Sequence, residues 1–276
     1  MAASFPPLGR SAADLISINK RFSSSCIPLD RLLGGGLPSG HVLELSGPPG
    51  TAKEILATKF ASSAVSVNDQ VLFVDMQNMA SPATLHPELR SKNLNLVDAS
   101  LELVYYLTVF TLPDLLIISP QSSLESSQIR LVILNSIWFP FQTAPGLTMS
   151  RRATLLVRVK QVLAKLCSSL DIAVVTTTQL ATKFLNPDGT PTSFDSGSRA
   201  VLVPLLGKSV LAYNYLPPHR TYRVLIVPET RTSGFDLFVN FTSQFKELYI
   251  FSEFCAYFRA QIMIVRTSPS KSHMKW

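Results

Sequence analysis

One short segment limits the possible folds of this chain more than any other feature. Residues 42–46 form an apolar run, residues 47–52 form a loop of glycine and proline, and a helical pattern follows from about residue 53 to residue 65. In such a turn, consecutive backbone N–H groups and the start of the helix together form a cradle for an anion. The pattern therefore predicts a buried strand whose carboxyl end carries a phosphate-binding loop.

The loop matches the P-loop pattern GxxxxGK[ST] at its first glycine and at Lys53, whose charge serves the outer phosphates. It departs at Ala52, where the pattern has glycine, and at Glu54, where the pattern has the hydroxyl that binds Mg²⁺. An alanine forced to positive φ costs about 1 kcal/mol. A carboxylate at Glu54 could bind a metal but would also repel the phosphates, and pairing with a base from a partner is the other alternative. An ordinary turn is the alternative interpretation.

The expected nucleotide-binding residues are Gly47, Pro48, Pro49, Gly50, Thr51, Ala52, Lys53 and Glu54.

Apolar runs separated by helical patterns recur along the chain, as expected of parallel strands with crossover helices. An amphipathic helix is predicted over residues 150–170. The predicted later strands lie at residues 71–75, 103–107, 131–135, 172–177, 200–203, 210–213, 222–227 and 235–241. The expected fold class is α/β, with a mostly parallel twisted sheet flanked by helices and antiparallel strands late in the chain.

This pattern predicts one domain over residues 23–244, preceded by a flexible arm at 1–22. Residues 245–276 are apolar and aromatic without a clear period. They either pack on the sheet, mediate a contact or come from a faulty gene model.

Composition is consistent with one folded domain, because 46% of the 276 residues are hydrophobic and only 16% are charged. The net charge of +7 suits a polyanion such as nucleic acid without requiring one. The three cysteines lie far apart without metal-site spacing, which predicts reduced thiols and no bound structural metal. With no secretory signal or membrane span in the pattern, we expect a soluble, intracellular protein that does not contact membranes.

Three further segments, taken in their order along the chain, carry a resemblance. Residues 27–40 read IPLDRLLGGGLPSG, residues 129–141 read IRLVILNSIWFPF and residues 174–179 read VVTTTQ. Together they resemble the RecA-like recombinase paralogs of eukaryotes, and the second segment is most similar to the C-type paralog. The resemblance covers about residues 22–242 and implies a RecA-type P-loop NTPase core.

The resemblance also implies roles for single residues. The strand at 131–135 ends in Asn135, where the family has the Walker-B aspartate, and Gln77 stands where the family has the glutamate that positions the attacking water. Gln179 matches a glutamine that senses nucleotide. Asn and Gln keep the shape of the acids but cannot act as bases. We therefore expect the chain to bind ATP, with Mg²⁺ weakly, rather than to hydrolyse it efficiently.

DNA contacts are implied by two loops of the family, at about residues 142–152 and 181–199. Their cations are Arg151, Arg152, Lys183 and Arg199, and they would bind single-stranded DNA in a salt-dependent way. The alternative is that these cations belong to an ordinary solvated surface.

The function that the resemblance implies is that of an accessory protein in homologous recombination and DNA double-strand-break repair. It would act in the nucleus with another recombinase paralog and the recombinase itself. An active DNA-dependent ATPase and a nucleotide-independent scaffold are the two alternatives.

Overall fold

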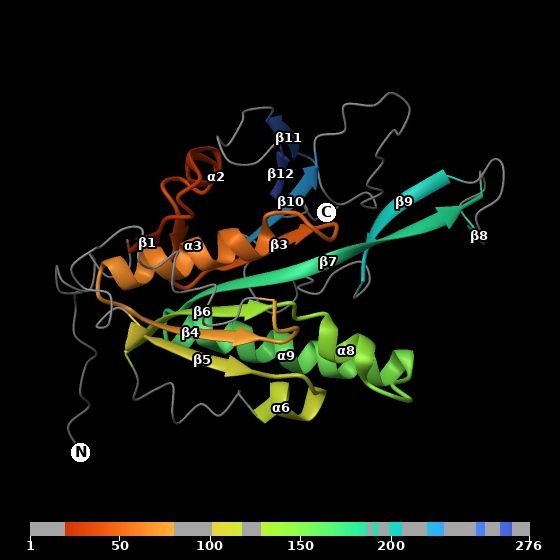
Figure 1. Cartoon of the computed structure of the whole chain (residues 1–276), viewed down its shortest axis with the longest axis horizontal. Coiled ribbons are helices and arrows are strands. Elements are labelled where there is room, and N and C mark those ends of the chain that lie inside the picture. Colours follow the sequence, from red (N-terminus) through yellow and green to blue (C-terminus); the bar gives the residue numbers. More distant parts are fainter. Residues whose placement is uncertain are drawn as a thin grey trace, which may run out of the picture.

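A mostly parallel sheet is the centre of the molecule. The computed structural model describes residues 20–79, 101–117, 128–186, 190–192, 199–205, 220–228, 247–251 and 260–266. Within them, six strands lie parallel in the order β10-β3-β7-β6-β4-β5 (Figure 1). They are β3 (Val42–Gly47), β4 (Gln70–Asp75), β5 (Val104–Thr108), β6 (Ile129–Asn135), β7 (Ala173–Leu185) and β10 (Thr221–Pro228).

The parallel strands confirm the α/β fold predicted from the apolar runs. Strands β3 to β6 begin and end within two residues of the predicted bounds. Every residue of β3 is buried, as expected for a central strand covered by helices on both faces. β10 pairs parallel with β3, and the antiparallel pairs among the described residues are those of β7 with β8 (Pro191–Thr192) and β9 (Arg199–Pro204), of β12 (Ala260–Arg266) with β10 and β11 (Glu247–Phe251), and of a short pair before β3. The strands predicted at 210–213 and 235–241 lie outside the described residues.

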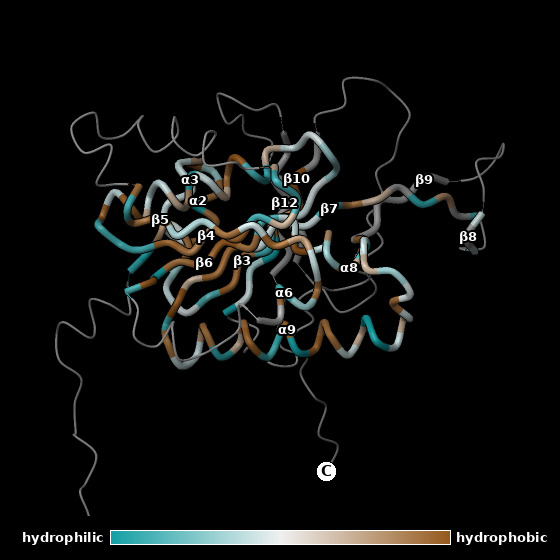
Figure 2. The backbone as a smooth tube through the Cα atoms, turned by 60° about the horizontal axis from the view of Figure 1, so that its bottom comes forward, coloured by the Kyte–Doolittle hydropathy of each residue, from teal (hydrophilic) through white to brown (hydrophobic). Residues whose placement is uncertain are grey.

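Two long helices cover opposite faces of the sheet. Helix α3 (Lys53–Ser66) packs Leu56 and Phe60 into one core, and α9 (Met149–Ser169) packs Leu163 into the other. Figures 1 and 2 show the sheet between them. The shorter helices are α2 (Ile27–Leu32), α6 (Leu112–Ile117) and α8 (Phe139–Thr143). Across the described segments, none of the helices combines the length and the apolar character that a membrane crossing needs.

The sheet continues into the segment whose structure the sequence left open. β12 (Ala260–Arg266) pairs antiparallel with β10, and β11 (Glu247–Phe251) pairs antiparallel with β12. Residues 247–251 and 260–266 thus extend the sheet at the edge formed by β10.

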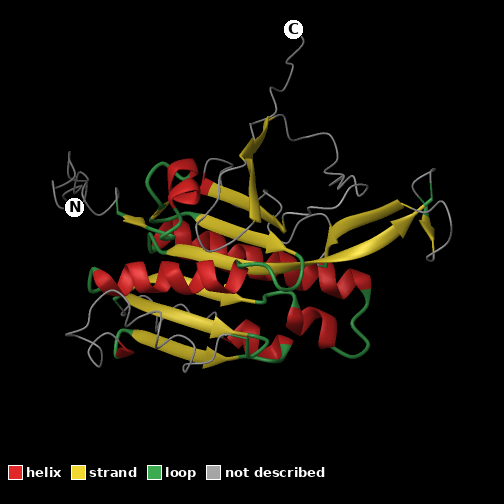
Figure 3. Ribbon diagram, turned by 45° about the horizontal axis from the view of Figure 1, so that its top comes forward, coloured by secondary structure: helices red, strands yellow, loops and turns green. Residues whose placement is uncertain are grey.

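β7 is much longer than the predicted strand at 172–177. Its second half, from Leu180 to Leu185, pairs antiparallel with β9 (Arg199–Pro204), and the short β8 (Pro191–Thr192) pairs with its end. Figure 3 shows this hairpin extending beyond the other strands. The segment expected as a loop at 181–199 is therefore partly a β-hairpin.

The glycine-rich segment before β3 forms a compact turn. Arg21 and Phe22, expected at the end of the flexible arm, form β1 (Arg21–Phe22) and pair with β2 (Leu37–Pro38). A Cβ atom at Gly36 would lie 2.5 Å from the Phe22 carbonyl oxygen, and its φ is +118°. Only glycine fits there. The Asp30 carboxylate accepts hydrogen bonds from Ser23 and Ser24 and fixes the start of α2 against this turn.

A buried ion pair joins β3 to β10. Arg223 Nη2 lies 2.9 Å from Glu44 Oε1, and both side chains are 2% exposed. The Ser46 hydroxyl donates to the same carboxylate oxygen. Burial lowers the pKa of the nearby Lys160 on α9, an effect that Glu44 opposes and Arg223 reinforces. The pair is therefore the charged contact between two neighbouring strands beneath α9.

Arg223→Met is expected to lower the free energy of unfolding by about 3–5 kcal/mol, because it leaves the Glu44 carboxylate buried without its partner. Adding Glu44→Gln removes that charge and keeps an acceptor for Ser46, so the double variant should recover most of the loss. Chemical denaturation measures both, with Arg130→Met on the exposed side of β6 as the control. A double variant less stable than Arg223→Met alone would contradict this account.

Candidate nucleotide-binding site

The loop between β3 and α3 lies where the strands of the parallel sheet end. A Cβ atom at Gly47 would lie 2.6 Å from Thr51 Oγ1 and 2.7 Å from the Ile226 carbonyl oxygen, so packing against β10 requires glycine. Gly50 has a φ of +77° and open space around it. The two prolines contribute no N–H, and the Thr51 N–H donates to the Pro48 carbonyl at 3.4 Å, so the amides left for an anion come from residues 50 and 52–54. α3 starts directly after the loop without a side-chain cap, which leaves its first N–H groups for a ligand.

Ala52 does not carry the strain that the sequence suggested. Its φ is −72° and its ψ is 20°, which any residue adopts easily. The expectation of a positive φ at this position is therefore wrong. The replacement of glycine by alanine leaves the backbone of the loop unstrained.

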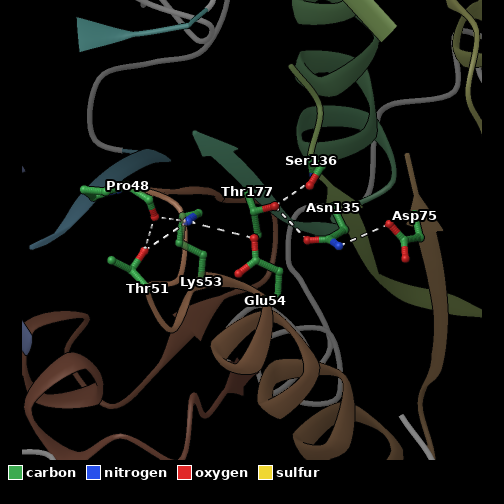
Figure 4. Close-up of polar contacts among 8 residues, drawn as sticks. All are labelled: Pro48, Thr51, Lys53, Glu54, Asp75, Asn135, Ser136 and Thr177. Atoms are coloured by element: carbon green, nitrogen blue, oxygen red, sulfur yellow. Dashed lines mark hydrogen bonds and ion pairs between the residues drawn. The ribbon is translucent and has the colours of Figure 1, made fainter. Parts of the chain in front are cut away.

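Lys53 is folded back onto its own loop. Its Nζ donates to the Pro48 carbonyl at 2.7 Å and to Thr51 Oγ1 at 3.0 Å (Figure 4). The Thr51 hydroxyl also donates to the Pro48 carbonyl, at 2.9 Å. The lysine side chain is only 4% exposed, and this burial lowers its pKa. The ammonium group of Lys53 is therefore already hydrogen-bonded to oxygen atoms of its own loop.

Glu54 faces the lysine. Its Oε1 lies 3.9 Å from Lys53 Nζ, and the proximity of the carboxylate raises the lysine pKa against the larger effect of burial. The Glu54 side chain is 25% exposed and belongs to the first turn of α3. The sequence left open whether it binds a metal or pairs with a base. In the structure it pairs with the neighbouring Lys53.

A second group of polar side chains lies where β4 and β6 end. Asp75 and Asn135 are direct neighbours across these strands, and both are fully buried. Asp75 Oδ1 accepts from Asn135 Nδ2 at 3.3 Å and from the Gln77 backbone N–H at 3.2 Å. Asp75 Oδ2 accepts from the Tyr106 hydroxyl at 3.2 Å. Burial raises the pKa of Tyr106, and the Asp75 carboxylate raises it further.

The group continues onto β7 through Thr177. The Thr177 hydroxyl donates to Asn135 Oδ1 at 2.7 Å and accepts from the Ser136 N–H at 2.7 Å (Figure 4). Ser136 has a φ of 59°, an uncommon conformation for serine that this hydrogen bond helps to fix. The amide of Asn135 is therefore oriented at both ends, with its nitrogen toward Asp75 and its oxygen toward Thr177.

The site contains binding groups but few groups for bond cleavage. Gln77 and Asn135 are amides and cannot take a proton from water. Asp75 keeps a carboxylate, but its oxygens accept three hydrogen bonds inside the protein. Gln179 lies opposite Gly47 in the β3–β7 register, which places it beside the loop. Among the described residues, no three His, Cys, Asp or Glu side chains gather as a metal site requires.

This loop, strand and helix geometry lies within a segment that matches a known family. Residues 23–110 match the family described as ATPase: KaiC. This segment is similar to a KaiC-like P-loop ATPase domain. Its fold class is that of the RecA-like P-loop ATPases, as the sequence predicted.

Known relatives of this ATPase domain are DNA repair proteins. The chain is 24% identical over 231 residues to DNA repair protein RAD51 homolog 3 of Dictyostelium discoideum, covering 73% of the chain and 58% of that relative. It is 26% identical over 213 residues to the protein of the same name from Cricetulus griseus, covering 67% and 55%. DNA repair and recombination protein RadB of Pyrococcus abyssi is 29% identical over 153 residues, covering 55% and 63%. The matched part is less than two thirds of each relative. The predicted resemblance is confirmed.

The predicted DNA-binding cations lie on regular elements of the ATPase domain. Arg151 and Arg152 belong to the first turn of α9 and not to a loop, because α9 begins at Met149. Arg151 is exposed, whereas Arg152 Nη2 donates to the Phe141 carbonyl at 3.3 Å. Lys183 is exposed on the hairpin, and Arg199 starts β9 opposite Leu185. Arg152 thus has a structural contact, and a role of any of the four in DNA binding stays a prediction.

Sequence reasoning missed the residues that position Asn135. Asp75, Tyr106 and Thr177 were not predicted as part of the site, yet they form the hydrogen bonds around it. One usable signal was the run of three threonines at 176–178. Polar residues at the end of an otherwise apolar buried strand indicate a polar site at that edge of a parallel sheet.

Asn135→Asp restores the acid of the Walker-B strand. We expect this substitution to destabilise the ATPase domain by about 1–3 kcal/mol at pH 8, because it places a second carboxylate beside Asp75. Repulsion raises the pKa of the introduced carboxyl in the folded state. The destabilisation is therefore largest above that pKa and disappears only as the pH falls below about 3, under the ordinary aspartate pKa, where the carboxyl is protonated in both states.

Denaturation at pH 5 and at pH 8 measures this change in stability. The swap Asp75→Asn with Asn135→Asp is the matched control, because it keeps one amide and one carboxylate and should lose much less stability. Equal stability of Asn135→Asp and the native chain at pH 8 would contradict the interpretation.

Proposed function

We propose that the chain is an accessory protein in homologous recombination and DNA double-strand-break repair. The observation that carries the proposal is a P-loop with its lysine in place, at a sheet edge where Gln77 and Asn135 replace the acids needed for hydrolysis. Such a site suits a protein that binds ATP weakly and turns it over slowly. The DNA repair proteins to which the chain is similar support the pathway and a nuclear location.

A partner subunit is a natural part of this proposal. In RecA-type assemblies the nucleotide lies between subunits, so a member without hydrolytic groups still completes the site of its neighbour. We propose another recombinase paralog as that partner and the recombinase filament as the structure that the pair assists. The loop supports this proposal, because Gly47 packs against β10 and Lys53 is buried in the loop beside the start of α3.

Single-stranded DNA is the proposed polyanion. Arg151 and Lys183 are exposed cations on α9 and on the hairpin, and phosphate contacts of this kind need charge and not sequence readout. Partly exposed Phe184 is next to Lys183 and is the aromatic residue nearest to it in the hairpin. Base stacking on a single aromatic side chain is limited, which favours an assisting role over strand exchange.

One observation favours a second candidate, a scaffold that functions without nucleotide. Lys53 already donates to Pro48 and Thr51 and pairs with Glu54, so the loop satisfies its own cation without phosphates. In this alternative the domain serves only as an interface between proteins.

For the leading proposal, we expect the tagged chain to capture a recombinase paralog from cells after DNA damage. The purified pair should hydrolyse ATP at least about a hundredfold more slowly than the roughly 10 s⁻¹ typical of enzymes. Lys53→Ala should weaken ATP binding, whereas Lys59→Ala, on the same helix, should not. Rapid DNA-stimulated hydrolysis that Lys53→Ala abolishes would instead show an active ATPase. Full repair activity of Lys53→Ala in cells would favour the scaffold.

DNA binding is tested by replacing Arg151 and Lys183 with glutamine. Each cation that contacts a phosphate of a single strand contributes about 0.7 to the slope of log K against log salt concentration. The double variant should therefore bind a labelled single-stranded oligonucleotide more weakly, with a slope smaller by about 1.4. The control, Lys59→Gln with Arg130→Gln, removes the same charge elsewhere. An equal loss in both variants would mean that only net charge matters.

A further inference from the structure

The charges at the phosphate end of the loop nearly cancel. Lys53 is the cation that a P-loop directs to the outer phosphates, and Glu54 places a carboxylate 3.9 Å from it. At that separation the carboxylate offsets much of the charge that the lysine would otherwise present to a phosphate. An incoming phosphate beyond the second one therefore meets an ion pair and not a free cation.

The inner phosphates meet different groups. The backbone N–H groups of residues 50 and 52–54, at the uncapped start of α3, offer an anion hydrogen-bond donors that do not depend on the Lys53 side chain. The loop backbone is intact, because Gly47 allows the close packing against β10, Gly50 adopts the positive φ of the turn and Ala52 is unstrained. The cradle is thus preserved where the first two phosphates bind and compromised where the third would bind.

The residues present do not fit Mg²⁺ in its usual place. Mg²⁺ requires oxygen ligands in near-ideal octahedral geometry, and the position of the usual hydroxyl ligand is occupied by Glu54. The Thr51 hydroxyl donates to the Pro48 carbonyl. Asn135, where a supporting aspartate is expected, is neutral, and its oxygen accepts from Thr177. The ion pair between Glu54 and Lys53 would have to break before the carboxylate could coordinate a metal.

From this arrangement we propose that the site prefers a nucleoside diphosphate to the Mg²⁺-bound triphosphate, and that Glu54 is the residue that sets the preference. The inference rests on the proposed nucleotide binding and names the nucleotide. A diphosphate uses the amide cradle fully and carries less charge toward Glu54. The third phosphate gains little from a lysine whose charge is already compensated.

The test is binding of fluorescent adenosine diphosphate and triphosphate to the full chain, each with Mg²⁺ and with a chelator. The native chain should bind the diphosphate about tenfold more tightly than the Mg²⁺-triphosphate, and Mg²⁺ should not improve the affinity for the diphosphate. Glu54→Gln removes the charge and should bring the two affinities together. Glu54→Thr also supplies the hydroxyl, so it should bind the Mg²⁺-triphosphate more tightly than the diphosphate.

Glu102→Gln is the matched control, because it removes an exposed carboxylate before β5, at the opposite end of the strands, and should leave the ratio unchanged. Thermal unfolding of each variant confirms that it is folded. Tighter binding of the Mg²⁺-triphosphate to the native chain, lost in Glu54→Gln, would make Glu54 a metal ligand and overturn the proposal. A ratio unchanged by Glu54→Gln would overturn it as well.

Absence of binding of either nucleotide would also overturn it. That outcome leaves the recombination role to be decided by partner capture, which requires no nucleotide.

Discussion

The parallel register of the central strands determines what this site contains. Gly47 lies opposite Gln179 in the β3–β7 ladder, and Asp75 lies opposite Asn135 in the β4–β6 ladder. Carboxyl ends of parallel strands meet at one edge, so a phosphate loop and a cluster of polar side chains are brought together there by strand pairing alone. The covering helices bury the apolar side chains of the strands in two cores, one on each face of the sheet.

Charge, and not shape, distinguishes this site from one built for hydrolysis. Asn135 fits between Asp75 and Thr177 because an amide both donates and accepts, which a carboxylate does not do at neutral pH. A carboxylate at position 135 would face that of Asp75 at hydrogen-bonding distance. The neutral residue and its surroundings are therefore matched to each other. At the loop, the opposite charges of Glu54 and Lys53 compensate each other, so the pair carries little net charge.

Much of the fold could be predicted from the sequence because buried parallel strands are continuous apolar runs. Val42 to Gly47 and Ile129 to Asn135 are such runs, and the motif between β3 and α3 located the phosphate loop. Features that depend on contacts between distant residues were not predictable. The sequence does not show that Arg152 donates to the Phe141 carbonyl or that β7 continues into a hairpin with β9. The φ of Ala52 was misjudged because the family pattern, and not the local geometry, suggested strain.

The same strand, β7, carries groups that belong to both proposed ligands. Thr177 lies in the polar network at the strand ends, Gln179 lies beside the phosphate loop, and Lys183 lies on the hairpin that the strand forms next. Between Gln179 and Lys183 the backbone changes partners from β3 to β9 without a break in the strand. Gln179 and Leu180, the last residue paired with β3 and the first paired with β9, are consecutive in this strand. One continuous strand therefore joins the proposed nucleotide site to the hairpin that carries Lys183.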